Sequence, residues 1–166
     1  MQTVHDHALS KEALFFADRE PPVTWSWPPS PTPGQDWRSA LINSLTRATA
    51  AHLRQCTDPV GHDAARQIQT VPALIRYEPV IYAGSEAEVS RLLTDHLPDP
   101  QARLAAALLM ATIRVAGHRC RAHMIDHPHH TDVPASISSP RGDLAAALHA
   151  VRQSPHHGSA HNPSDT

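Results

Sequence analysis

The feature that most constrains this chain is a long apolar stretch between Asp99 and Met124. The pair Asp99-Pro100 is typical of a helix start, because proline is tolerated in the first turn, where a backbone N–H has no partner to lose. From Leu104 to Gly117 the residues are almost all small or apolar. Helical spacing sorts them into two stripes, one of Leu104, Leu108, Ala111 and Val115 and one of Ala106, Met110, Ile113 and Gly117.

A helix that is apolar on two sides needs cover on both of them. We expect one side to pack in the chain's own core and the other to meet a second copy of the chain. The alternative is a central helix surrounded by its neighbours in a larger monomeric bundle. The residues expected at the dimer interface lie on this helix and on the last one: Ala106, Leu109, Ile113, Gly117, Leu144, Ala147, Leu148 and Val151.

The rest of the sequence also has helical patterns, and no stretch alternates convincingly as a strand. Ser10 and Asp36 are good N-caps for helices that follow them. Pro79 lies inside a long helical pattern and predicts a kink or break near Tyr77. The expected helices span residues 10–20, 36–55, 59–70, 72–97, 99–124 and 143–153. The fold class is therefore predicted to be all-α, a bundle of about six helices.

Two segments are not expected to join the bundle. Residues 21–35 contain six prolines, which fix φ and remove backbone donors, so we expect a Pro-rich linker there. The tail, residues 154–166, is polar and poor in apolar side chains, and we expect it to be disordered. The 166 residues are enough for one domain with a core of its own.

Composition and motifs exclude several function classes. A formal net charge of −2 is not typical of a nucleic-acid binder. Cys56 and Cys120 are too few for a disulfide framework, and we expect both to be buried or inert. A secretory signal and a long apolar span are both missing, so we expect a cytoplasmic protein that does not contact the membrane. We find no nucleophile elbow, phosphate loop or pair of carboxylates in an apolar setting, and we expect neither enzyme activity nor a cofactor.

The fourteen histidines raise the question of a metal site. His123 and His127 are spaced i, i+4, and His129 and His130 follow them. Pro128 interrupts any helix at this point, however, and no cysteine or carboxylate framework accompanies the histidines. We expect adventitious metal binding at most, with a His-rich metal carrier as an alternative.

Several segments carry a resemblance to a known family. The run TVHDHALSKEALFFADRE, residues 3–20, resembles the end of the DNA-binding domain of TetR-family transcriptional regulators. The matching residues are Thr3, Val4, His7, Ser10, Lys11, Glu12 and Leu14. Residues 68–78, 99–117 and 143–153 resemble, in the same order, segments of the regulatory domain of actinobacterial members.

The resemblance implies a division of the chain and a set of DNA contacts. Residues 1–20 would be a remnant of the helix-turn-helix domain, and residues 36–153 a helical domain for ligand binding and dimerisation. Residues that would face operator DNA are Gln2, Thr3, His5 and Lys11. Since the sequence begins inside the recognition helix, we expect DNA binding only if the missing N-terminal helices are supplied.

The resemblance also implies a cavity for a small apolar or acyl-type effector. Arg114 is of interest because an arginine in an apolar helix needs a carboxylate, a ligand anion or solvent. The other candidate wall residues, for which plain core packing is the alternative, are Trp37, Leu41, Leu45, Ile68, Leu74, Tyr77, Ile81 and Met110. The function predicted by resemblance is effector-controlled repression by a homodimer. The alternative function is a helical dimerisation or interaction module that binds neither DNA nor effector.

Overall fold

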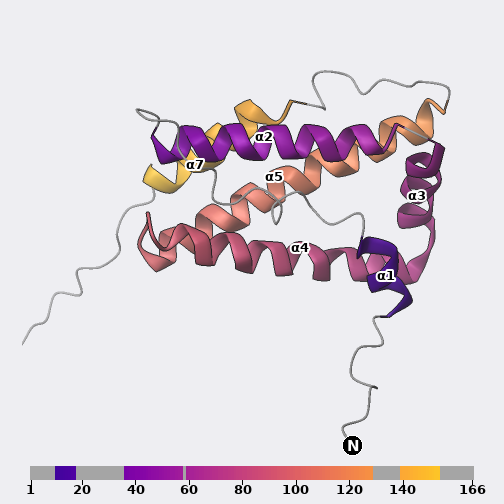
Figure 1. The fold of residues 1–166 in the computed structure, drawn as a ribbon, viewed down its shortest axis with the longest axis horizontal. Coiled ribbons are helices and arrows are strands. Elements are labelled where there is room, and N and C mark those ends of the chain that lie inside the picture. The colour runs from indigo at the N-terminus through magenta and orange to yellow at the C-terminus, as the bar shows by residue number, and fades with distance from the viewer. Residues whose placement is uncertain (1–9, 18–35, 58, 129–138, 154–166) are drawn as a thin grey trace, which may run out of the picture.

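The computed structural model describes residues 10–17, 36–57, 59–128 and 139–153. Within these residues the chain forms helices and no strand, which confirms the predicted all-α class (Figure 1). The helices are α1 (Lys11–Ala17), α2 (Trp37–Gln55), α3 (Pro59–Thr70), α4 (Pro72–Leu93), α5 (Asp99–Asp126) and α7 (Arg141–Gln153). No helix in the described part of the chain is both long and apolar enough to cross a bilayer.

Helix α5 is the centre of the bundle. It contacts α2, α3, α4 and α7, and its most extensive contacts are with α4. Figure 1 shows α2 and α4 on opposite sides of α5, with α7 beside α2. The short helix α3 closes one end of this arrangement, and α1 lies on α4 near the same end.

Helix starts largely follow the predicted caps. The Asp36 carboxylate accepts hydrogen bonds from the backbone N–H groups of Arg38 and Ser39, at 3.0 and 3.2 Å, so Asp36 is the N-cap of α2. The Ser10 hydroxyl accepts from the backbone N–H of Ala13 at the start of α1. In α5, Asp99 is the first helical residue, and Pro98 occupies the N-cap position without a side-chain hydrogen bond.

Pro79 does not break α4, so of the predicted kink or break near Tyr77 the break does not occur. The helix runs from Pro72 to Leu93 with Pro79 inside it. Pro79 and Ile75 are both exposed. The Ile75 carbonyl, which loses its helical donor to the proline ring, therefore lies on the side of the helix that water reaches.

The main hydrophobic core fills the space between α2, α4, α5 and α7. Its buried members are Leu41, Leu45, Tyr82, Val89, Leu93, Ala102, Ala105, Ala106, Leu109, Met110, Ile113, Leu144, Leu148 and Val151. Small residues of α5 allow its neighbours to approach closely, and leucines of α2 and α7 fill the spaces between them.

Seven of the eight residues predicted for a dimer interface are buried within one chain, which corrects their assignment; Ala147 is half-buried. Six of them belong to the main core: Ala106, Leu109, Ile113, Leu144, Leu148 and Val151. Ala147 packs against that core, and Gly117 is buried facing Tyr82 of α4. Both stripes of α5 are apolar, so periodicity could not say which one meets the chain's own helices.

The other stripe of α5 is the one left at the surface. Leu104 and Val115 are 38% and 45% exposed, Ala111 is exposed and Leu108 is half-buried. Leu108, Ala111 and Val115 line a shallow groove between α5 and α7, with Ala147 on its far side.

The junction between α2 and α3 depends on Gly61. A Cβ at this position would overlap the Gln55 carbonyl oxygen and lie 2.8 Å from the Cα of Cys56. Both obstacles are backbone atoms, which cannot move aside as a side chain can. A glycine is therefore required for the first turn of α3 to pack on the last turn of α2.

We predict that Gly61→Ala lowers the free energy of unfolding by about 1–3 kcal/mol or more, because it forces backbone atoms apart. The matched control is Gly84→Ala in the exposed middle of α4, where a new Cβ meets no atom within 4 Å. This control should raise stability by up to about 1 kcal/mol through helix propensity. Urea denaturation followed by circular dichroism measures both, and equal effects of the two substitutions would contradict the close packing.

Candidate ligand-binding cavity

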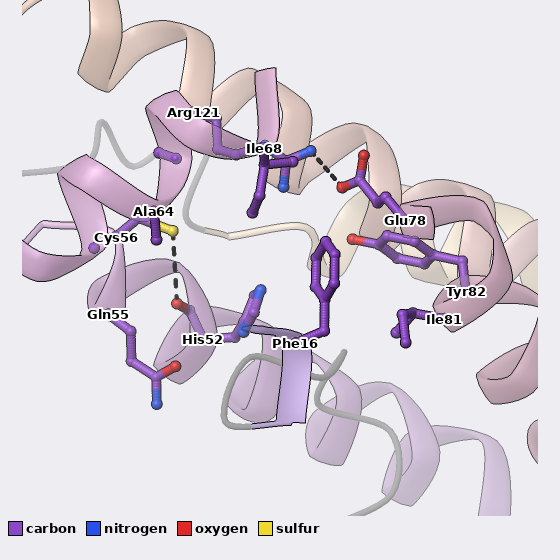
Figure 2. A pocket seen from close by; sticks show the side chains of 12 residues that line it. Phe16, His52, Gln55, Cys56, Ala64, Ile68, Glu78, Ile81, Tyr82 and Arg121 are labelled. Carbon is purple, nitrogen blue, oxygen red and sulfur yellow. Dashed lines mark hydrogen bonds and ion pairs between the residues drawn. The ribbon is translucent and has the colours of Figure 1, made fainter. Parts of the chain in front are cut away.

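A cavity of about 60 Å³ lies at the α3 end of the bundle (Figure 2). Helices α1 to α5 all contribute to its wall. The lining residues are Phe16, His52, Gln55, Cys56, Gly61, Ala64, Ala65, Ile68, Glu78, Ile81, Tyr82 and Arg121. An engineered cavity of about 150 Å³ takes up benzene, so this one holds a few waters or a very small molecule unless its walls move apart.

The apolar wall comes from α1, α3 and α4. Ile68 packs in a small buried cluster with Phe16 of α1 and Leu74 of α4. The Phe16 ring is 4% exposed and stacks on Tyr77 at 6.0 Å between centroids, while Phe15 meets it edge-on at 5.3 Å. Helix α1 is thus held on α4 by aromatic contacts beside the cavity.

The polar side of the cavity is built on an ion pair between α4 and α5. Arg121 Nη2 donates to Glu78 Oε1 at 2.5 Å, and the two side chains are only 6% and 10% exposed. The other Glu78 oxygen lies 3.6 Å from His118 Nε2. Charges this deep require partners, because removing an ion from water costs several kcal/mol. Arg121 lines the cavity, and its Nε is buried with no hydrogen-bond partner in the structure.

Tyr82 follows Glu78 by one helical turn, which places both on the same face of α4. Burial raises the pKa of the Tyr82 phenol to about 12; the Arg121 charge opposes this shift and Glu78 adds to it. The phenol is therefore neutral and can donate a hydrogen bond at neutral pH. Gly117 of α5 makes room for it, since a Cβ there would lie 3.4 Å from the Tyr82 hydroxyl oxygen.

His52 faces the cavity from the last turns of α2 (Figure 2). Burial, assisted by the positive charge of Arg121, lowers the pKa of the His52 imidazole to about 4. The ring is therefore neutral at physiological pH. Its Nδ1 is buried with no hydrogen-bond partner in the structure. Phenol, guanidinium and imidazole thus offer several polar groups to one small, mostly apolar space, which is how small-molecule sites are usually built.

Four of the predicted pocket residues lie in or beside this cavity. Ile68 and Ile81 line it. Leu74 and Tyr77 lie next to it, in the cluster that holds Phe16, and are not part of its lining.

The other predicted pocket residues lie elsewhere. Leu41, Leu45 and Met110 are in the main core, and Trp37 packs against that core with its ring stacked 4.9 Å from His96. Arg114 is exposed on α5. The arginine that reaches the cavity is Arg121, two helical turns further along nearly the same face of α5.

Sequence reasoning missed the residues that give the cavity its polarity: His52, Glu78, Tyr82 and Arg121. A signal existed in the pair Glu78 and Tyr82, which share one face of an otherwise largely apolar helix. No comparable signal identifies Phe16, because its role depends on how α1 docks on α4.

The predicted DNA-contacting residues and the histidines are placed only in part. Lys11 is exposed at the start of α1, whereas Gln2, Thr3 and His5 lie outside the described residues. The rings of His123 and His127 stack at 4.5 Å. In the part of the chain that the structure describes, no three His, Cys, Asp or Glu side chains come together as a metal site would require.

Comparisons of the chain with protein-family models, curated proteins and solved structures find no match. The resemblance to TetR-family regulators therefore stays a prediction from the sequence.

The low pKa of His52 predicts a pH-dependent stability. The unfolded state binds a proton below pH 6.5 and the folded state only below about pH 4, so stability falls as the pH is lowered through this window. We expect His52→Gln to remove about 2 kcal/mol of the stability difference between about pH 7 and pH 5. Urea denaturation at both pH values measures it, with His149→Gln on the exposed face of α7 as control. An unchanged pH dependence in His52→Gln would contradict the burial of a neutral imidazole.

Proposed function

We propose that this chain is the effector-binding and dimerisation part of a TetR-like transcriptional regulator. The observation that carries the proposal is the cavity with several polar groups whose wall includes Phe16. Phe16 belongs to α1, and in the sequence resemblance this helix directly follows the DNA-recognition helix. A molecule in the cavity would therefore touch the element through which DNA binding is controlled.

The contacts around α1 suggest how occupancy of the cavity would be transmitted. Phe16 is buried against Tyr77 of α4, and the next turns of α4 supply Glu78, Ile81 and Tyr82 to the cavity wall. An effector too large for the existing space would displace Phe16 or α4, and α1 would move with them. Such a molecule shifts the equilibrium only by the difference in its affinity for the two arrangements.

The wall also limits the chemistry of the effector. Most of it is apolar, from Phe16, Ala64, Ala65, Ile68 and Ile81. Its polar groups include the neutral Tyr82 phenol and the Arg121 guanidinium. A short acyl group with a carboxylate or carbonyl oxygen fits this combination.

Short straight-chain carboxylates, from acetate to hexanoate, are suitable probes of the cavity. We expect at least one of them to raise the unfolding temperature of the chain, with a stabilisation of roughly 2.7 kcal/mol at a concentration one hundred times its dissociation constant. Ala65→Leu, which fills the space next to Ile68, should abolish the shift, and Ala51→Leu on the exposed side of α2 should keep it. Equal shifts in all three proteins, or none in any of them, would contradict an effector site here.

The second candidate function, an interaction module without an effector, is favoured by a different observation. The stripe of Leu104, Leu108, Ala111 and Val115 leaves an apolar face of α5 at the surface. Such a face is useful to a module that only associates with other chains. The carboxylate series separates the two functions, because an interaction module predicts no specific stabilisation by any member.

Both functions use a second copy of the chain, and the groove between α5 and α7 is the surface that suits it. Leu108 and Ala147 give it an apolar floor, while Arg119 and Asp143 supply charges of opposite sign at one end. In a twofold dimer, Arg119 of one copy can face Asp143 of the other, and the same contact is then repeated with the two copies exchanged. We place the dimer contact here.

We predict that Val115→Arg converts a dimer to a monomer, because it puts a charge at the end of the apolar stripe, where Val115 lines the groove. Val80→Arg is the matched control, since Val80 is a comparably exposed valine on α4, away from the groove. Sedimentation velocity over a range of concentrations distinguishes the two species. A wild-type chain that sediments as a monomer, or a Val115→Arg variant that still dimerises, would contradict this interface.

A further inference from the structure

The chain's two cysteines meet beside the cavity. Cys56 is the C-cap of α2 and Cys120 lies in α5, far away in the sequence. Cys120 is fully buried in a small cluster with Leu53 and Met124, and Cys56 packs against this cluster. Cys56 is only half-buried and forms part of the cavity wall (Figure 2). One thiol is thus reached through the cavity and the other lies behind it.

The two thiols lie at the same junction of α2 and α5, because Cys56 packs against the small cluster that contains Cys120. The Cys120 thiol donates to the Leu53 carbonyl at 3.8 Å, and the Cys56 thiol donates to the His52 carbonyl at 4.0 Å. The neighbouring Cys56 thiol and burial both raise the pKa of the Cys120 thiol. Cys120 therefore stays protonated and is a poor first nucleophile.

We propose that Cys56 and Cys120 form a reversible dithiol–disulfide pair, closed by a small hydroperoxide that reaches Cys56 through the cavity. In the first step the Cys56 sulfur attacks one peroxide oxygen, the O–O bond breaks, and Cys56 becomes a sulfenic acid while one water (or alcohol) leaves. In the second step the Cys120 sulfur attacks the Cys56 sulfur, an S–S bond forms, and the hydroxyl leaves as water with the Cys120 proton. Two thiols are oxidised and one peroxide is reduced.

The geometry suits this order of events. The cavity of about 60 Å³ is large enough for a molecule the size of hydrogen peroxide, which is only slightly larger than water. Cys56 packs against the cluster that contains Cys120, so the thiol that would resolve the sulfenic acid lies at the same junction of α2 and α5. Once formed, the bond would join the end of α2 to α5 next to His52 and Gln55, and would stiffen that wall of the cavity. This proposal does not depend on the proposed regulatory function.

The test uses the full chain, reduced, desalted and then titrated with hydrogen peroxide in the folded state. We expect one peroxide to be consumed for two thiols lost, a decrease in intact mass equal to two hydrogens, and a proteolytic fragment in which Cys56 is joined to Cys120. Dithiothreitol should restore both thiols. The oxidised chain should also unfold at a higher temperature than the reduced one, because the bond restricts the unfolded state.

Two variants assign the roles of the thiols. In Cys120→Ser the oxidation should stop at a Cys56 sulfenic acid that dimedone traps, and in Cys56→Ser the buried Cys120 should react at least tenfold more slowly. Even if one of the variants folds poorly, proteolytic mapping of the oxidised wild-type chain shows whether Cys56 is joined to Cys120. Two free thiols after excess peroxide, or disulfides only between chains, would overturn the proposal. A Cys120→Ser variant without a dimedone adduct would overturn the assignment of Cys56 as the thiol attacked first.

Discussion

The ion pair between Glu78 and Arg121 is the interaction on which the cavity end of this structure depends. Both charges lie almost completely inside the protein, so each would destabilise the fold strongly without the other. The pair joins α4 to α5 at this end of the bundle. Nearby, Tyr82 of α4 lies against Gly117 of α5, where a Cβ would come within 3.4 Å of its hydroxyl oxygen. Glu78, Arg121 and Tyr82 together supply the polar side of the cavity that α4 and α5 build.

The two ends of the bundle differ in what fills them. The main core between α2, α4, α5 and α7 consists of leucines, alanines and other aliphatic side chains that interlock closely. At the α3 end the buried residues form smaller separate clusters, with charged and polar groups between them. The cavity, the docked Phe16 ring and the paired thiols all occur at this end. The main core is thus closely packed, whereas the α3 end leaves a cavity of about 60 Å³.

Much of the fold could be predicted from the sequence, because helix periodicity and capping are local. Asp36 and Ser10 sit where a cap is needed, and the six helical segments follow the apolar repeats. The sequence could not say whether Pro79 breaks α4, because the effect of a proline depends on which side of the helix it occupies. The two stripes of α5 could not be told apart either, since both are apolar and only the neighbouring helices decide which one is covered. The cavity was hardest to predict, because Arg114 and Arg121 occupy similar positions on α5 and only Arg121 has a carboxylate within reach.

The role of the Glu78–Arg121 ion pair is tested most directly by a double-mutant cycle. The free energy of unfolding is measured for Glu78→Gln, for Arg121→Met and for the two substitutions combined. We predict that each single change costs about 3–5 kcal/mol, because it leaves the remaining group buried without its partner. The double variant should lose less than the sum, with a coupling energy of about 2–3 kcal/mol. Glu88→Gln, which breaks the exposed pair with Arg91 on the same helix, should have little effect. Additive losses at Glu78 and Arg121, or a Glu78→Gln variant no less stable than Glu88→Gln, would contradict the central role of the pair.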